Sequence, residues 1–193
     1  MDGGHAMEMQ GSRVIAADQA VVWAALLDPE VLKACVPGCT ELAGSSATGF
    51  EATVIQKVGP VKATFKGAVT LSDMDAPNSL KIEGEGKGGP AGFAKGGAKV
   101  RLAPHVNGTE ITYDVEAKIG GKLAQLGSRI IDSFAKKMAD QFFQSFQEVV
   151  EGQMGEPNSA PDGVAASDGE ADEPVKKTSW FKRLTGGGPS ASE

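Results

Sequence analysis

Two neighbouring strand-like segments carry almost no bulk on the side that should face the protein interior. The first alternates apolar or glycine positions with charged ones over residues 82–87, and the second does the same over residues 94–101. Successive strand side chains point to opposite faces, so the charged set marks the face that meets water. Gly84, Gly86 and Gly96 then stand where Val, Ile or Leu would normally fill a core.

An interior strand position without a side chain has two explanations. Either a neighbouring backbone comes close or forms a bulge there, or the space is empty. The same deficit on two adjacent strands favours empty space, and an apolar space of sufficient size is a ligand pocket. The sequence therefore predicts a hydrophobic cavity whose floor includes Gly84 and Gly86.

The 193 residues are expected to form one domain followed by a tail. Residues 1–6 are interpreted as a cloning remnant or a disordered start, and residues 7–151 as the ligand-binding domain. Residues 152–175 carry six acids and no base, and residues 176–193 carry four bases and one acid. The first of these segments cannot bury enough apolar surface to fold and is read as a disordered acidic linker. No secretory signal and no apolar run of about 18 residues are found, which predicts a cytoplasmic protein.

Alternation and turn signals predict an antiparallel sheet closed by one long helix. A strand over residues 8–16 precedes a helix over 20–27 and a second short helix that begins near Pro29. Further strands are expected over the ranges 49–58, 61–72, 82–87, 94–101 and 109–119. Residues 122–151 have helical period and would span about 45 Å. The expected fold class is α+β, a curved sheet around the helix with the cavity between them.

Residues that face this space are candidates for ligand contact. They are Gln56, Phe65, Val69, Gly84, Gly86, Gly96, Ala98, Tyr113, Val115, Gly127, Ile131, Phe134, Met138 and Phe142. The aromatic and methionine side chains among them fit a plain hydrophobic core equally well. Gln56 and Tyr113 are polar groups on apolar stripes, so each either bonds within the protein or holds the polar head of an apolar ligand.

No set of catalytic or metal-ligating residues stands out. His5 lies in the segment read as a cloning remnant or disordered start, and His105 lies in a predicted turn. Neither histidine is accompanied by a nucleophile and by a third group that would orient the imidazole toward it. Cys35 and Cys39 are spaced Cys-x3-Cys and not as the redox Cys-x2-Cys, which favours structural thiols over a redox or metal role. We therefore expect that the protein is not an enzyme. A cyclase or hydrolase would need an acid–base pair, for which Tyr113 is the one candidate.

The C-terminal tip combines cations with large apolar side chains. The residues are Lys176, Lys177, Trp180, Phe181, Lys182, Arg183 and Leu184. Aromatic rings favour the headgroup boundary, and each Lys or Arg near an anionic leaflet contributes about 1 kcal/mol. A reversible membrane contact is one interpretation, and a solvated end or a helix docked on a partner protein are the others. Positive charge confined to this tip does not suit nucleic-acid binding.

Several motifs resemble the CoxG family of carbon monoxide dehydrogenase subunits, roughly over residues 7–151. They are the N-terminal strand, residues 36–39 (VPGC), 59–63 (GPVKA), 65–67 (FKG) and 120–129 (GGKLAQLGSR), and Lys136-Lys137. The resemblance implies a helix-grip fold of the START-like (SRPBCC) superfamily with a hydrophobic cavity between sheet and helix. It also implies an accessory role for a molybdenum-containing CO dehydrogenase, or a related molybdenum hydroxylase, and the handling of the lipid quinone that accepts its electrons.

Two functions remain open from these observations. In the first, the domain binds an isoprenoid quinone such as menaquinone and carries it between the inner face of the cell membrane and the enzyme. In the second, the domain docks the dehydrogenase, the tail tethers it to the membrane, and the cavity carries no ligand. A leucine at Gly84 or Gly86, which would fill the cavity, should abolish the carrier function and leave recruitment of the dehydrogenase intact.

Overall fold

The computed structural model describes residues 4–153. Its elements are β1 (His5–Ile15), α1 (Gln19–Leu27), α2 (Pro29–Cys35), β2 (Cys39–Ser45), β3 (Gly49–Val58), β4 (Val61–Asp75), β5 (Ser79–Lys87), η1 (Gly89–Ala91), β6 (Phe93–His105), β7 (Gly108–Gly120), η2 (Gly121–Leu126) and α3 (Ser128–Gln153). The prediction of an α+β fold with a sheet wrapped around one long helix is confirmed.

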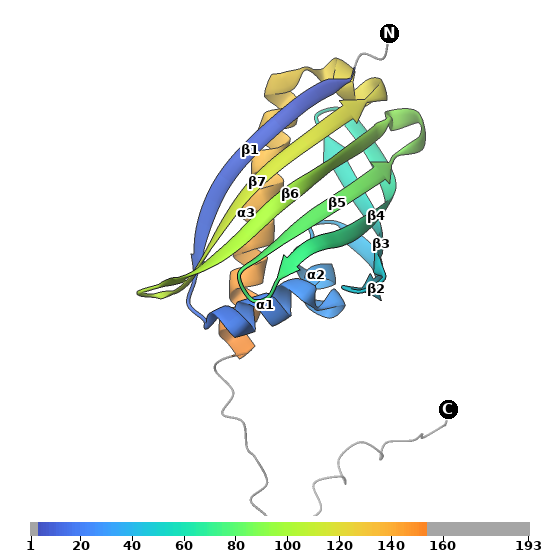
Figure 1. The fold of residues 1–193 in the computed structure, drawn as a ribbon. Helices are drawn as coiled ribbons and strands as arrows, with labels where there is room; N and C mark the ends of the chain where they lie inside the picture. Colours follow the sequence, from blue (N-terminus) through green and yellow to red (C-terminus); the bar gives the residue numbers. More distant parts are fainter. Residues whose placement is uncertain (1–3, 154–193) are drawn as a thin grey trace, which may run out of the picture. The chain divides into compact units, whose positions relative to one another are not determined.

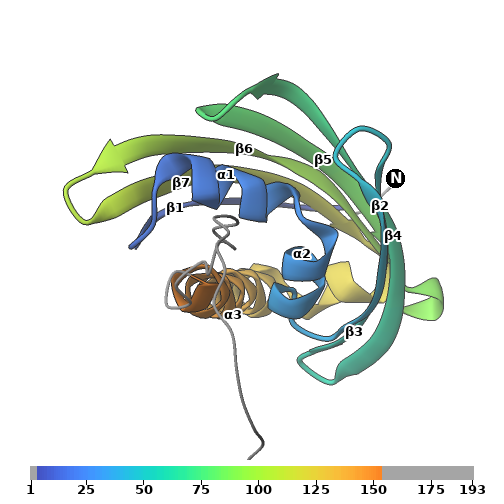
Figure 2. The same ribbon diagram turned by 90° about the horizontal axis from the view of Figure 1, so that it is seen from below.

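One antiparallel sheet of seven strands forms the wall, in the order β1-β7-β6-β5-β4-β3-β2. Each strand from β2 to β7 pairs with its neighbour in sequence, which short turns such as Val106-Asn107 permit. The first strand joins the last, as His5 opposite Ile119 and Ile15 opposite Thr109 show. Figure 2 shows the resulting arc, with α3 and α2 inside it.

The boundaries differ from the sequence predictions in three places. β1 begins at His5, so the last two residues of the segment read as a disordered start belong to the sheet. The predicted helix over 122–151 is divided into η2 and α3, because Gly127 between them has a positive φ of 83° that ends the first turn. β2 was not anticipated. It pairs only with β3 and forms an edge of the sheet.

Two separate cores hold the helix in the arc. The larger lies where α1, α2 and the C-terminal half of α3 meet the sheet, and Ile15, Val22 and Phe146 are completely buried there. The smaller lies at the opposite end of α3, around Leu123 and Ile131. We call this second region the η2 end, and define it as the β3–β4 turn (residues 59–60), η1, η2 and the first turn of α3 (Figure 1).

Candidate functional site

Small residues stand side by side on the concave face of the sheet, between the two cores. In one row of paired residues Ala52, Gly67, Gly86 and Ala94 cross β3 to β6. In the adjacent row Gly84, Gly96 and Ala117 cross β5 to β7. We call these seven residues the small-residue floor. Every one of them is partly exposed, although each points to the inner side of the arc.

The helix does not close over this floor completely. α3 packs most closely on β1, at one edge of the sheet, and on α2, which itself packs on β2 at the other edge, and not on the central strands. Phe134, Met138 and Phe142 of α3 are each partly exposed, as are Val69, Ala98 and Val115 on the sheet. Phe134 packs against the core at the η2 end, and Phe142, Ala98 and Val115 pack against the larger core, so these side chains border the two cores while each keeps some free surface.

The glycines of the floor fall into two groups, which corrects the prediction that they all mark missing bulk. A Cβ at Gly67 would stand 2.7 Å from the Glu85 carbonyl oxygen, one at Gly84 3.0 Å from that of Ala68, and one at Gly96 2.7 Å from Ala117 Cα. At these positions glycine allows neighbouring strands to approach as the sheet bends. A Cβ at Gly86 would have no atom within 4 Å. The space beside Gly86 is therefore unfilled.

The remaining predicted contact residues are distributed over several environments. Ile131 is only 3% exposed and belongs to the core at the η2 end. Phe65 is partly buried and packs against the same core. Gly127 faces open space, but it lies in the link between η2 and α3 and not in a helical stripe. Ligand contact by these residues stays a prediction.

The two polar candidates lie toward opposite sides of the sheet. The Gln56 side-chain amide on β3 donates to the Pro37 carbonyl oxygen just after α2, so it is engaged within the protein. Tyr113 on β7 is 8% exposed and stacks on Phe143 of α3 with 5.0 Å between ring centroids. Its ring lies against Gly11 of β1, the residue directly opposite in the register. Any side chain at Gly11 would overlap the Tyr113 ring.

The Tyr113 ring also lines a groove of about 330 Å³ between β1 and α3. An ion pair between Arg13 and Asp140 joins the two walls, and the Arg13 guanidinium lies 6.0 Å from the centre of the Phe143 ring. A second hollow of about 390 Å³ separates α2 from α3 and is lined by both cysteines and by polar residues of α3. Gly86 lines neither hollow.

The titratable groups show no catalytic arrangement within residues 4–153. His105, predicted to lie in a turn, is the exposed last residue of β6, and its Nδ1 accepts a hydrogen bond from the Asn107 backbone N–H at 3.1 Å. Across these residues no cluster of His, Cys, Asp and Glu could hold a metal ion. No helix in the same range is long and apolar enough to cross a membrane. The predicted tail contacts from Lys176 to Leu184 lie outside the described residues.

Burial suppresses the reactivity of both thiols. It raises the pKa of Cys35, which is 1% exposed, to about 11, and it also raises the pKa of Cys39. The Cys39 thiol donates to the Glu41 carbonyl oxygen at 3.3 Å. Because the thiolate is the nucleophile, neither cysteine is activated for redox chemistry.

At pH 8 we expect iodoacetamide to modify Cys39 slowly and Cys35 only after unfolding, as peptide mass spectrometry would measure. The raised pKa of Cys35 stabilises the fold while the unfolded thiol is protonated, and this contribution is lost as the pH rises from about 9 toward about 11. Rapid labelling of Cys35 in the folded protein would contradict this assignment.

Comparison with known proteins agrees with this architecture. The family described as the CoxG subunit of carbon monoxide dehydrogenase matches residues 11–151, which include nearly all of the sheet and α3. The chain belongs to the CoxG family. A search of the curated proteins found no match. The CoxG family is tied to CO dehydrogenase as an accessory component, and nothing in the match indicates catalysis.

Solved structures share the fold. A conserved protein from Geobacillus kaustophilus superposes with a TM-score of 0.71 at 28% identity, over 76% of this chain and 97% of that one. A protein from Rhizobium leguminosarum gives 0.59 at 15% identity, over 77% and 96%. One from Rhodobacter sphaeroides gives 0.56 at 16% identity, over 75% and 93%. With these START-like neighbours, the helix-grip fold expected from the sequence is confirmed.

The sequence analysis missed part of the floor. Ala52, Gly67, Ala94 and Ala117 were absent from the candidate residues, although alternation alone places them on the inward face. Their signal is their small size at inward positions. What the sequence lacks is the register that brings them beside Gly84 and Gly86.

Proposed function

We propose that this chain binds a lipid quinone, such as menaquinone, and carries it between the membrane and a molybdenum-containing CO dehydrogenase or a related molybdenum hydroxylase. The observation that carries the proposal is the unfilled space beside Gly86, on a floor of small residues faced by partly exposed apolar side chains. The CoxG family membership supports the choice of enzyme. A long isoprenoid tail suits such an apolar surface, since burying it there removes it from water.

The quinone head needs one or two hydrogen-bond donors for its carbonyl oxygens. The Gln56 amide already donates to Pro37, so Tyr113 is the better candidate. Its ring lines the groove between β1 and α3. Met9, which lines the same groove, is paired with Val115, and Val115 is paired with Ala98 on the concave face. This neighbourhood supports a head group near Tyr113 and a tail directed toward Gly86.

The carrier would work in the cytoplasm and touch the inner face of the cell membrane. The sequence of the C-terminal tip, with Trp180 and Phe181 among four cations, supports such a contact. Binding through one aromatic cluster and a few charges is reversible, which suits a shuttle better than a permanent anchor.

Mass spectrometry of the bound lipid tests the carrier function. Organic extraction of the protein, purified from a quinone-producing host, is expected to release a prenylated quinone, and added menaquinone should bind to the stripped protein in detergent. A matched extract of an unrelated protein of similar size controls for carry-over of free lipid. If no prenylated species is extracted and no menaquinone binds, the carrier function is excluded.

One observation favours the alternative, a membrane-recruitment factor that docks the dehydrogenase without a ligand. Close strand approach accounts for the absence of side chains at Gly67, Gly84 and Gly96 without any ligand. Gly86 is then the floor glycine at which the two functions make different predictions, and a variant that fills the space beside it decides between them.

A further inference from the structure

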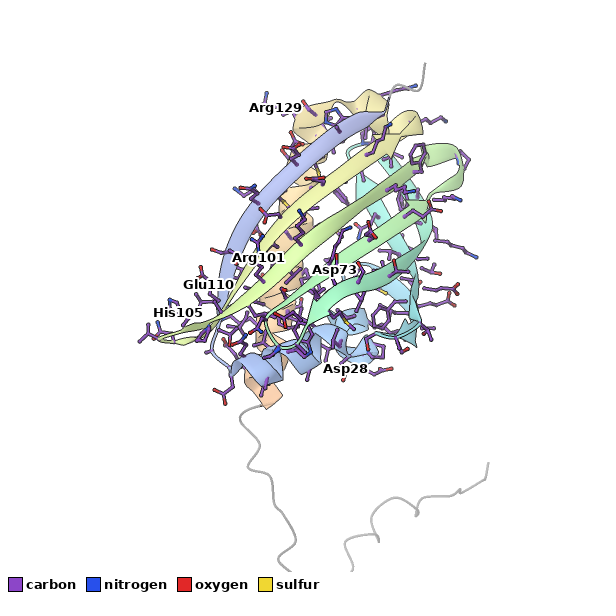
Figure 3. The ribbon with its side chains drawn as sticks, in the orientation of Figure 1. Asp28, Asp73, Arg101, His105, Glu110 and Arg129 are labelled. Carbon is purple, nitrogen blue, oxygen red and sulfur yellow. The ribbon has the colours of Figure 1, made fainter. Side chains whose placement is uncertain are left out.

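Charge is distributed unevenly along the length of the folded domain. Eight exposed cations lie toward the η2 end, whereas exposed Lys33 and Arg101 lie toward the other end; the eight are Lys57, Lys62, Lys66, Lys87, Lys95, Lys118, Lys122 and Arg129. Acids gather at the opposite end, and they are Asp18, Asp28, Glu30, Asp73, Asp75, Glu110, Glu148 and Glu151. Figure 3 labels Arg129 at one end and Asp28 and Glu110 toward the other, where Arg101 is also labelled. The 26 residues of α3 separate these ends by about 39 Å.

Four of these lysines surround an exposed aromatic ring on the convex face of the sheet. Phe93, the first residue of β6, is 42% exposed, and its ring lies over Gly120 of β7. Lys87 is directly opposite Phe93 on β5, and Lys66 is opposite Lys87 on β4. Lys95 and Lys118 face each other one row further along β6 and β7. We call Phe93 and these four lysines the Phe93 patch.

The acids near the patch only partly offset its charge. Glu85 pairs with Lys87 at 3.2 Å and is also directly opposite Lys95 on β6, and Glu116 lies one row further from the η2 end. Beyond the patch, Lys122 and Arg129 add positive charge, and exposed Asp132 lies one helical turn after Arg129. Ile130 adds a second exposed apolar side chain, 39% exposed, beside the β3–β4 turn.

Cations around exposed apolar side chains at one extremity of a domain match the surface of an anionic bilayer. The cations are attracted to the lipid headgroups, and a ring such as that of Phe93 enters the headgroup boundary. A single-stranded nucleic acid would need several aromatic platforms along a groove, and the Phe93 patch offers one ring on a convex face. The chemistry therefore favours lipid over nucleic acid.

The patch also lies directly outside the unfilled space. Lys87 and Phe93 point to the convex face, while their chain neighbours Gly86 and Ala94 point to the concave face and are paired with each other. A bilayer on the patch would thus meet the end of the sheet behind which Gly86 faces open space. Because the two faces are opposite sides of one sheet, a membrane lipid would pass around the end of the sheet near η1 to reach the floor.

We propose that the η2 end of the folded domain, through the Phe93 patch, is itself a contact surface for anionic membranes, separate from the C-terminal tip. Its purpose, to orient the domain for lipid uptake, rests on the proposed carrier function. The contact itself does not, because it depends only on the charges and the exposed ring.

Vesicle sedimentation of the full chain tests the contact. Trp180→Ser and Phe181→Ser are introduced throughout to weaken the tip, and vesicles of phosphatidylcholine with 30% phosphatidylglycerol are compared with pure phosphatidylcholine. Lys95→Glu with Lys118→Glu is expected to lower the partition coefficient on the anionic vesicles at least about tenfold. Phe93→Ser should lower it by a smaller factor, and on neutral vesicles all variants should bind equally weakly.

Lys81→Glu with Lys99→Glu is the matched control. These lysines are also directly opposite each other on the convex face, but further from the η2 end, and the pair changes the net charge by the same amount. The control is expected to retain binding within about twofold, with circular dichroism melting to confirm that all variants fold. If both double variants lost vesicle binding equally, net charge alone would explain the loss and the proposal would be overturned. Unchanged vesicle binding by both double variants would overturn it as well.

Menaquinone binding in detergent keeps this test separate from that of the carrier function. The Lys95→Glu and Lys118→Glu variant should bind menaquinone normally, since neither side chain faces the floor. If the protein binds anionic vesicles through the patch but binds no quinone, the proposed membrane contact is supported and the proposed carrier function is excluded. A preference for an acidic protein partner over both vesicle types would overturn the membrane assignment.

Discussion

A Gly86→Leu variant is expected to fold normally and to bind menaquinone at least about 100-fold more weakly than the native protein. A Cβ at Gly86 meets no atom within 4 Å, and the backbone there has no positive φ, so the leucine enters space that the fold leaves empty. The same space is where the proposed isoprenoid tail lies, and a close-packed contact tolerates little extra volume. Menaquinone that remains bound after gel filtration, quantified by mass spectrometry, measures the loss.

Ala68→Leu supplies the matched control for this experiment. Ala68 follows Gly67 on β4 and is exposed on the convex face, so the substitution adds bulk to the same part of the sheet on its other side. This variant should bind menaquinone like the native protein. Unchanged binding by Gly86→Leu would show that no ligand occupies the floor, and the recruitment function would then stand if the dehydrogenase still reached the membrane.

The sequence predicted the inward face of each central strand correctly, because strand alternation is a local property that charged neighbours make visible. Glu83, Glu85 and Lys95 identify the outer face without any knowledge of the rest of the chain. The roles of the inward glycines were not predictable in the same way. Gly86 and Gly96 have equivalent local patterns, yet only Gly96 is crowded by the next strand, since crowding depends on cross-strand register and on how sharply the sheet bends.

The placement of Tyr113 shows the same limit. Alternation predicted that the ring points inward, which the structure confirms, but the neighbours of the ring depended on a strand about a hundred residues away. Gly11 of β1 lies directly opposite Tyr113 and leaves room for its ring, and Phe143 of α3 stacks on it. No local pattern could have indicated either neighbour.

The start of the long helix was mispredicted for a local reason. Leu123 and Leu126 are three residues apart, a spacing that suits one face of an α-helix and equally a 3₁₀ turn. Leu123 is buried in the core at the η2 end, as the predicted stripe required, but from a 3₁₀ turn. The positive φ of Gly127 decides the boundary, and glycine in a sequence permits such a conformation without requiring it.

The second large effect is expected at Gly96, where alanine should destabilise the fold by about 3 kcal/mol. A methyl group there would overlap the Glu116 carbonyl oxygen and stand 2.7 Å from Ala117 Cα, so β6 and β7 must separate to admit it. These two strands pair from Phe93 opposite Gly120 to His105 opposite Gly108, and a local separation disturbs the middle of that ladder. Urea unfolding measures the change, and the melting temperature should fall by roughly 6–12 °C.

Gly86→Ala separates steric crowding from the general effect of replacing a strand glycine. It is the same substitution on the adjacent strand, but its methyl group enters open space. Because alanine restricts the unfolded chain more than glycine does, this variant should be unchanged or more stable by up to about 1 kcal/mol. If both alanine variants were equally stable, the strands would not approach closely at Gly96. The glycines of the floor would then all mark space that no side chain fills, as the sequence predicted.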